Sequence, residues 1–234
     1  MKVIDKINIK TEELSPPCKL KKLVLLRIDP EDKREAISRI YYEISNLSWI
    51  NKFDKKIIQE SYRKRSEKTI VAIKEKLDKY EDDQIISEIG EYFVSEISRQ
   101  SIVSELNYLN IPLAELWKEQ KTGNPGFDFH SESNKNIIIY GESKYDSRQN
   151  AYNRALKQIV GFIVDNKHIE EVSDLINFVS PEAIGNIGND IKGFAAAFSS
   201  YNIETNQLIK NILENENFKS LKMNDELILI AVNM

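Results

Sequence analysis

The clearest β-strand pattern in this chain ends in charged residues. Residues 137–141 read Ile-Ile-Ile-Tyr-Gly, and Glu142, Ser143 and Lys144 follow without a break. A second acid, Asp128, lies a short distance upstream between two phenylalanines. Branched and aromatic residues favour strands, so both segments are expected to be extended. The chain is therefore constrained to place two carboxylates and one ammonium group close to a strand.

The spacing of the two segments predicts a β-hairpin that turns at residues 131–136. Alternation along a strand puts Glu142 and Lys144 on one side and Ser143 on the other. If the segments pair antiparallel, Asp128 meets Glu142 across the ladder. A Ser147-to-Phe162 segment with helical spacing follows, and a strand that returns into a helix predicts an α/β sheet.

Two carboxylates about 4 Å apart repel by roughly 4 kcal/mol at an effective dielectric constant of 20, which a bound cation would offset. Mg²⁺ fits best, with Mn²⁺ as an alternative, because it takes oxygen ligands and commonly uses one or two carboxylates. The expected metal ligands are Asp128, Glu142 and the backbone carbonyl of Ser143. Lys144 would orient or deprotonate a water, or stabilise charge on a phosphate. This chemistry is that of metal-dependent phosphodiester hydrolysis, with DNA as the expected substrate.

The acid-x-Lys spacing carries little information by itself. It recurs at Glu31/Lys33, Asp54/Lys56, Glu119/Lys121, Asp165/Lys167 and Asp190/Lys192, none of which ends an apolar strand preceded by an acidic partner. The structural alternative for Glu142 and Lys144 is an exposed hairpin end with one ion pair, worth about 0–1 kcal/mol. The apolar surroundings of the acids favour function. His130 is a rival ligand for metal or phosphate, but a structural role, such as a hydrogen bond to backbone, is the favoured interpretation.

Composition limits the remaining possibilities. The chain has 234 residues and a single cysteine, Cys18, so an internal disulfide is impossible and a reducing compartment is expected. Its start lacks an apolar core of signal-peptide length, and no run reaches the length of a membrane span, which predicts a cytoplasmic protein without a membrane partner. A net charge of −4 gives no general basic footprint for nucleic acid, so a local stripe of Lys and Arg or a basic partner would have to supply it.

Apolar periodicity predicts the other elements. The expected order is irregular residues 1–20, a strand at 20–28, helices at 31–47, 51–80 and 82–109, a short strand or extended link at 111–117, a loop at 121–126, helical patches at 169–179, 190–199 and 203–213, and a final strand at 226–232. The segment 51–80 also carries Lys55-Lys56 and Arg63-Lys-Arg65 as candidate phosphate contacts, although a solvated helix face is the better interpretation.

The Gly-Phe-Asp of residues 126–128 and the Tyr-Gly-Glu-Ser-Lys of 140–144 together resemble the core of the PD-(D/E)xK nuclease superfamily. The literal motif is not kept, because Pro125 and Asp128 are not adjacent. The resemblance implies a restriction-endonuclease-like core, with a central mixed β-sheet flanked by helices. It implies that residues 81–234 form this core and residues 1–80 an N-terminal α/β elaboration or partner-binding region.

The same resemblance implies further site residues. Glu91, after Gly90 on the long helix, matches the leading glutamate of the superfamily, with Glu88 as its rival. Gln158 matches a glutamine that faces the site in many such nucleases. Independently of the resemblance, Arg148, Arg154 and Lys157 are the expected contacts with DNA phosphates, because they fall on or near the helix that leaves the expected site directly after Lys144.

Residues 85–200 are also similar to the nuclease subunit of Hachiman-type phage-defence systems. The shared order is a Gly-Glu helix, the Gly-Phe-Asp segment, the Gly-Glu-Ser-Lys strand and an Ala-rich helix. This similarity implies an antiviral effector that degrades DNA and is held in check by a helicase partner. The alternatives are a restriction endonuclease, or a non-catalytic nuclease-like subunit of a defence or repair complex.

Overall fold

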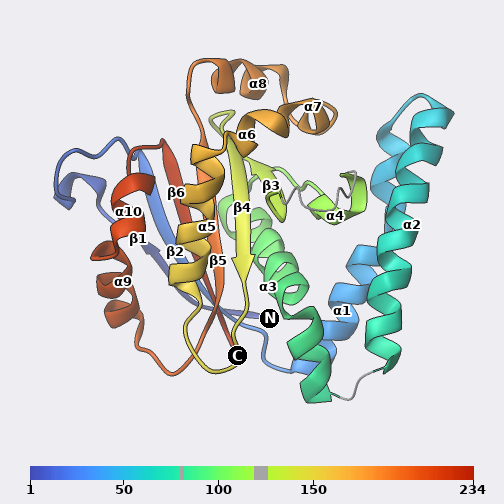
Figure 1. Ribbon diagram of the computed structural model, residues 1–234, viewed down its shortest axis with the longest axis horizontal. Coiled ribbons are helices and arrows are strands. Elements are labelled where there is room, and N and C mark those ends of the chain that lie inside the picture. The colour runs from blue at the N-terminus through green and yellow to red at the C-terminus, as the bar shows by residue number, and fades with distance from the viewer. Residues whose placement is uncertain (80–81, 119–125) are drawn as a thin grey trace.

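Six strands form one mixed sheet. They are β1 Lys2–Asn8, β2 Lys22–Asp29, β3 Phe129–Glu132, β4 Ile138–Lys144, β5 Gly193–Ser200 and β6 Glu226–Asn233. In the computed structural model they lie in the order β1-β2-β6-β5-β4-β3 (Figure 1). The four inner strands are parallel, and β1 and β3 pair antiparallel at the two edges. The structure describes residues 1–79, 82–118 and 126–234, apart from the side chains of residues 77–88.

Helices flank this sheet. In chain order they are η1 Thr11–Glu13, α1 Lys33–Ser45, η2 Leu47–Lys52, α2 Lys56–Lys79, α3 Asp82–Leu106, α4 Ala114–Trp117, α5 Tyr152–Val164, α6 Lys167–Glu170, α7 Val172–Leu175, α8 Pro181–Gly188, α9 Thr205–Leu213 and α10 Glu216–Leu221. Both α3 and α5 contact β4, with α5 in front of the sheet and α3 behind it in Figure 1. The expected α/β architecture with a central mixed sheet is therefore present. Among the described helices, none has the length and hydropathy needed to cross a bilayer.

The inner strands are buried on both faces. The expected strands at 20–28 and 226–232 are confirmed as β2 and β6, which pair in parallel. Their apolar residues follow one another without polar alternation, as is usual for parallel strands covered on both sides. The N-terminal β1 and β2 thus belong to the same sheet as the strands that follow residue 80.

The prediction of a helical patch at residues 190–199 is wrong. From Gly193 onward this segment belongs to β5, which lies between β4 and β6. Ala195, Ala196 and Ala197 favour a helix by intrinsic propensity, yet all three are fully buried in the sheet. Pairing on both sides outweighs that propensity, and the small side chains let α3 and α5 contact the strand from opposite faces.

Three boundaries also differ from expectation. Residues 1–20 are not wholly irregular, because β1 alternates exposed and half-buried positions along the sheet edge. Residues 111–117 are not a strand or a fully extended link, because they end in the single helical turn α4. The helix expected from residue 147 begins at Tyr152. The expected loop at 121–126 lies outside the described residues except for Gly126.

Candidate functional site

The β3–β4 hairpin brings Asp128 to the end of β4. The pair Phe129–Gly141 sets the register, so Asp128 stands one step beyond it, opposite Glu142. The backbone N–H of Asp128 donates to the Gly141 carbonyl at 2.9 Å. The backbone N–H of Ser143 donates to Asp128 Oδ2 at 2.7 Å. These two bonds hold the Asp128 carboxylate beside the Glu142-Ser-Lys144 segment.

Lys144 joins the hairpin to α3. Its Nζ lies 2.8 Å from Glu142 Oε1 and 3.4 Å from Glu91 Oε1. It also donates to the Ser143 carbonyl at 3.0 Å. Glu142 is 1% exposed, whereas the side chain of Glu91 is half exposed. Acids from two elements therefore surround one ammonium group at the rim of the sheet. The side chain of Glu88, the rival of Glu91, is outside the described part of the chain.

Two glycines make room for this arrangement. A Cβ on Gly141 would lie 2.3 Å from the Phe129 ring, so the residue before Glu142 must be small. A Cβ on Gly90 would lie 2.3 Å from the Tyr145 ring. Gly90 thus lets the segment after Lys144 approach α3, which brings Glu91 within reach of the lysine.

A further carboxylate, Glu115 on α4, was not anticipated from the sequence. The backbone N–H of Ala114 donates to the Asp128 carbonyl at 3.0 Å, which fixes α4 against the hairpin. Glu115 Oε2 is buried and has no hydrogen-bond partner among the described residues. Burial, and then the charge of Asp128, raise the pKa of Glu115 to about 8. One signal was present: Glu115 is the only charged residue in the apolar run 111–117.

Side chains of α2 hold α4 in place through hydrogen bonds to the last carbonyl groups of α4. Arg65 Nη1, Ser66 Oγ and Thr69 Oγ1 donate to the carbonyl oxygens of Trp117, Leu116 and Glu115 at 3.0, 2.7 and 2.8 Å. A one-turn helix cannot satisfy these groups internally. The bonds from α2 therefore determine where Glu115 lies.

Burial and crowding raise the pKa values of acidic side chains at the site. Burial raises the pKa of Asp128 to about 6, although Lys144 and the Ser143 N–H oppose the shift. Burial, and then Asp128, raise the pKa of Glu142 well above its usual range. Burial opposes the charge of Lys144, but its neighbours Glu142, Asp128 and Glu91 outweigh burial and raise its pKa. The carboxylates thus compete for one buried cation, which is the condition under which a second cation binds favourably.

His130 does not face this group of acids. Its Nε2 lies 2.6 Å from Glu171 Oε2. Glu171 Oε1 accepts from the Phe127 N–H at 2.8 Å and lies 2.6 Å from Lys118 Nζ. Burial, and then the charge of Lys118, lower the pKa of His130 to about 4, so the ring is neutral. This contact fits the favoured structural role, with the Glu171 carboxylate as the partner of the ring.

The expected DNA contacts lie in different surroundings. Arg154 reaches the site, with Nη2 4.0 Å from Glu91 Oε1 and Nη1 3.8 Å from Asp146 Oδ2. Arg148 and Lys157 are exposed, and Gln158 is half-buried on α5. Of these four residues, Arg154 is the one that the structure brings into contact with Glu91, an acid of the candidate site.

The described residues contain no group of three or more His, Cys, Asp or Glu side chains arranged to hold a metal. A pair of carboxylates is nevertheless within the ordinary donor set of Mg²⁺, which keeps several waters. Glu142 Oε2 is buried without a hydrogen-bond partner in the described part of the chain. Asp128 and Glu142 therefore stay the candidate ligands for a divalent ion, and the Ser143 carbonyl, the third expected ligand, accepts a hydrogen bond from Lys144.

Comparison with protein-family models, with curated proteins and with solved structures found no match. The functional argument therefore depends on the geometry and charge of the site itself.

Proposed function

We propose that this chain is a metal-dependent deoxyribonuclease that hydrolyses phosphodiester bonds. One observation carries the proposal: Asp128, Glu142 and Lys144 meet at the end of a buried strand, and the carboxylates lack sufficient positive charge around them. Retaining a buried, mutually repelling pair of acids is costly, so such pairs mark functional sites.

The residues would divide the chemistry as follows. Asp128 and Glu142 would hold Mg²⁺ or Mn²⁺, which supplies a Lewis acid and lowers the pKa of water. Lys144 would hold the attacking water through Nζ or neutralise charge that develops on the phosphate. Glu91, whose side chain is half exposed, would position Lys144 from the α3 side. Arg154 and Lys157 on α5, and Arg148 just before it, would contact phosphates, with Gln158 beside them.

Plasmid degradation in Mg²⁺ tests this proposal. Glu142→Ala and Lys144→Ala are expected to lower the rate by about 10²–10⁴-fold, the range typical of single catalytic groups. Glu12→Ala is the matched control. It removes an exposed carboxylate that is distant in sequence from Glu142 and Lys144, and it should cleave like the wild type. Equal rates for all four proteins would end the enzyme proposal.

The resemblance to phage-defence nucleases extends the proposal to a helicase partner that restrains cleavage in an antiviral system. The assay should therefore also be run with a co-expressed helicase partner. Cleavage that changes when the partner is added, and that still requires Glu142, would support regulation of this site.

A non-catalytic, nuclease-like subunit is the second candidate function. It is favoured by the 2.8 Å Lys144–Glu142 ion pair, which occupies both groups without a metal, and by the net charge of −4. Calorimetric titration with Mg²⁺ separates the two. A protein that assembles with its partner but shows no Mg²⁺ binding dependent on Glu142 would fit this second function.

A further inference from the structure

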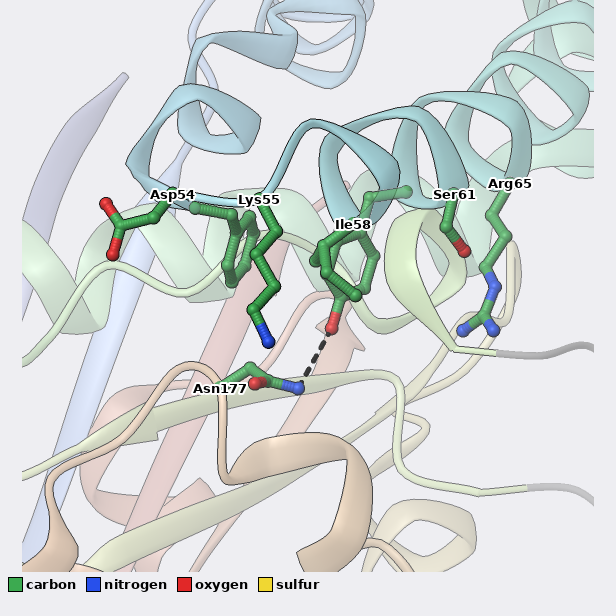
Figure 2. Close-up of a pocket in the computed structure, with 8 residues that line it drawn as sticks. Asp54, Lys55, Ile58, Ser61, Arg65 and Asn177 are labelled. Atoms are coloured by element: carbon green, nitrogen blue, oxygen red, sulfur yellow. Dashed lines mark hydrogen bonds between the residues drawn. The ribbon is translucent and has the colours of Figure 1, made fainter.

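A separate pocket of about 430 Å³ lies against the first half of α2 (Figure 2). Its lining residues are Phe53, Asp54, Lys55, Ile58, Ser61, Tyr62, Arg65 and Asn177. None of these is an acid of the candidate site. The size falls within the range of about 300–1,000 Å³ that is common for small-ligand pockets.

Positive charge lines this pocket at two points. Lys55, just before α2, and Arg65 on α2 extend toward the side where Asn177 lies, whereas Asp54 points away from the other labelled side chains (Figure 2). Arg65 is fixed by its bond to the Trp117 carbonyl. Among the described residues, no carboxylate forms an ion pair with Lys55 or Arg65, so both side chains can bind an anion. The pocket therefore favours a negatively charged ligand.

The remaining lining suits a flat ring with polar edges. Phe53 and Tyr62 stack with centroids 4.8 Å apart, and Ile58 is 37% exposed beside them. Tyr62 Oη accepts from Asn177 Nδ2 at 3.2 Å, which leaves the Tyr62 hydroxyl proton to be donated to a ligand. Ser61 and the Asn177 amide add both donors and acceptors. Apolar surface beside hydrogen-bonding groups is the combination that contacts nucleobases and sugars.

We propose that this pocket binds a nucleotide, with its phosphate at Lys55 and its base against Ile58 and the Phe53–Tyr62 pair, whereas Arg65 lies at the opposite end of the pocket (Figure 2). The nucleotide is either free or one unit of a single strand, because both present the same phosphate and ring. Binding is independent of the hydrolysis proposed above and is measured without turnover.

Calorimetric titration of the full chain in EDTA, with deoxyadenosine monophosphate and with a short single-stranded oligodeoxyadenylate, tests the proposal. Lys55→Glu is expected to weaken binding by at least about tenfold, because it replaces a charged hydrogen-bond donor with a repelling group. Lys56→Glu makes the same charge change at the next residue, the first of α2, which does not line the pocket, and should bind within about twofold of the wild type. Both residues are exposed, so the two variants should melt like the wild type.

The two probes also identify the source of the nucleotide. If the oligonucleotide binds about tenfold or more tightly than the mononucleotide, and the mononucleotide displaces it, the pocket takes a unit of a strand. Comparable affinities identify a free nucleotide. Glu142→Gln should bind either probe like the wild type, so loss of cleavage does not imply loss of this site. Failure of both probes to bind at millimolar concentration, or equal losses in the two lysine variants, would overturn the proposal.

Discussion

At the scale of single residues, Glu115 links stability to pH. Its pKa of about 8 and the pKa of Asp128 of about 6 are both higher than in an unfolded chain, where carboxyl groups titrate near 4. The folded protein therefore binds more protons between about pH 4 and pH 8, and its free energy of unfolding falls as pH rises through that window.

Glu115→Gln removes the ionisation but keeps the shape of the side chain. We expect this variant to unfold at higher denaturant concentration than the wild type at pH 8, and at a similar concentration at pH 4. Urea unfolding at both pH values measures the difference, with Glu12→Gln as the exposed control. A destabilised Glu115→Gln protein at pH 8 would show that the ionised carboxylate is stabilising.

Gly90 provides a second residue-scale prediction. Gly90→Ala should destabilise the fold by about 1–3 kcal/mol through overpacking against Tyr145, despite the better helix propensity of alanine. Gly161→Ala in α5 is the matched control, because no atom lies within 4 Å of its added Cβ. That control should be neutral or stabilising by up to about 1 kcal/mol. Thermal unfolding of both variants checks the pair, and equal shifts would contradict the close approach of Tyr145.

At the scale of elements, α4 depends on α2 rather than on its own length. Ser66→Ala should cost about 1–3 kcal/mol, because it leaves the buried Leu116 carbonyl without its donor. Ser38→Ala, at an exposed position on α1, makes the same change without that loss and should be neutral. Urea unfolding compares them. If the two variants matched, the α2–α4 bonds would contribute nothing to stability.

The elements also show what the sequence could predict. The hairpin at Asp128 and Glu142 was predictable because alternation and turn chemistry act over a few residues. The helical segments before and after it had clear periodicity. β5 was not predictable, because Ala195, Ala196 and Ala197 take their conformation from pairing with β4 and β6, which are distant in sequence. Glu115 was missed for the same reason: its proximity to Asp128 is set by tertiary bonds from α2.

At the scale of the whole molecule, the sheet contains strands from both sides of the division expected near residue 80. β2 pairs with β6 along its length, and its buried leucines belong to the common core. Deleting residues 1–80 should therefore expose the edge of β6 and abolish cooperative unfolding. Deleting residues 1–9 removes only the edge strand β1 and should leave a folded protein. Circular dichroism melts distinguish the two. A cooperative transition in residues 81–234 alone would show an independent C-terminal domain.

Divalent metal should act on the entire folding equilibrium, because a cation that binds only the folded site stabilises the whole chain. Mg²⁺ at about a hundredfold excess over its dissociation constant should raise the free energy of unfolding by about 2.7 kcal/mol. The gain should be larger at pH 8 than at pH 5, because the raised pKa values keep the carboxyl groups protonated at the lower pH. Glu142→Gln should lose most of the gain, and Glu12→Gln should retain it. Sodium chloride at matched ionic strength controls for screening. An equal Mg²⁺ effect on wild type and Glu142→Gln would place the ion elsewhere, and the proposed metal site would then have to be abandoned.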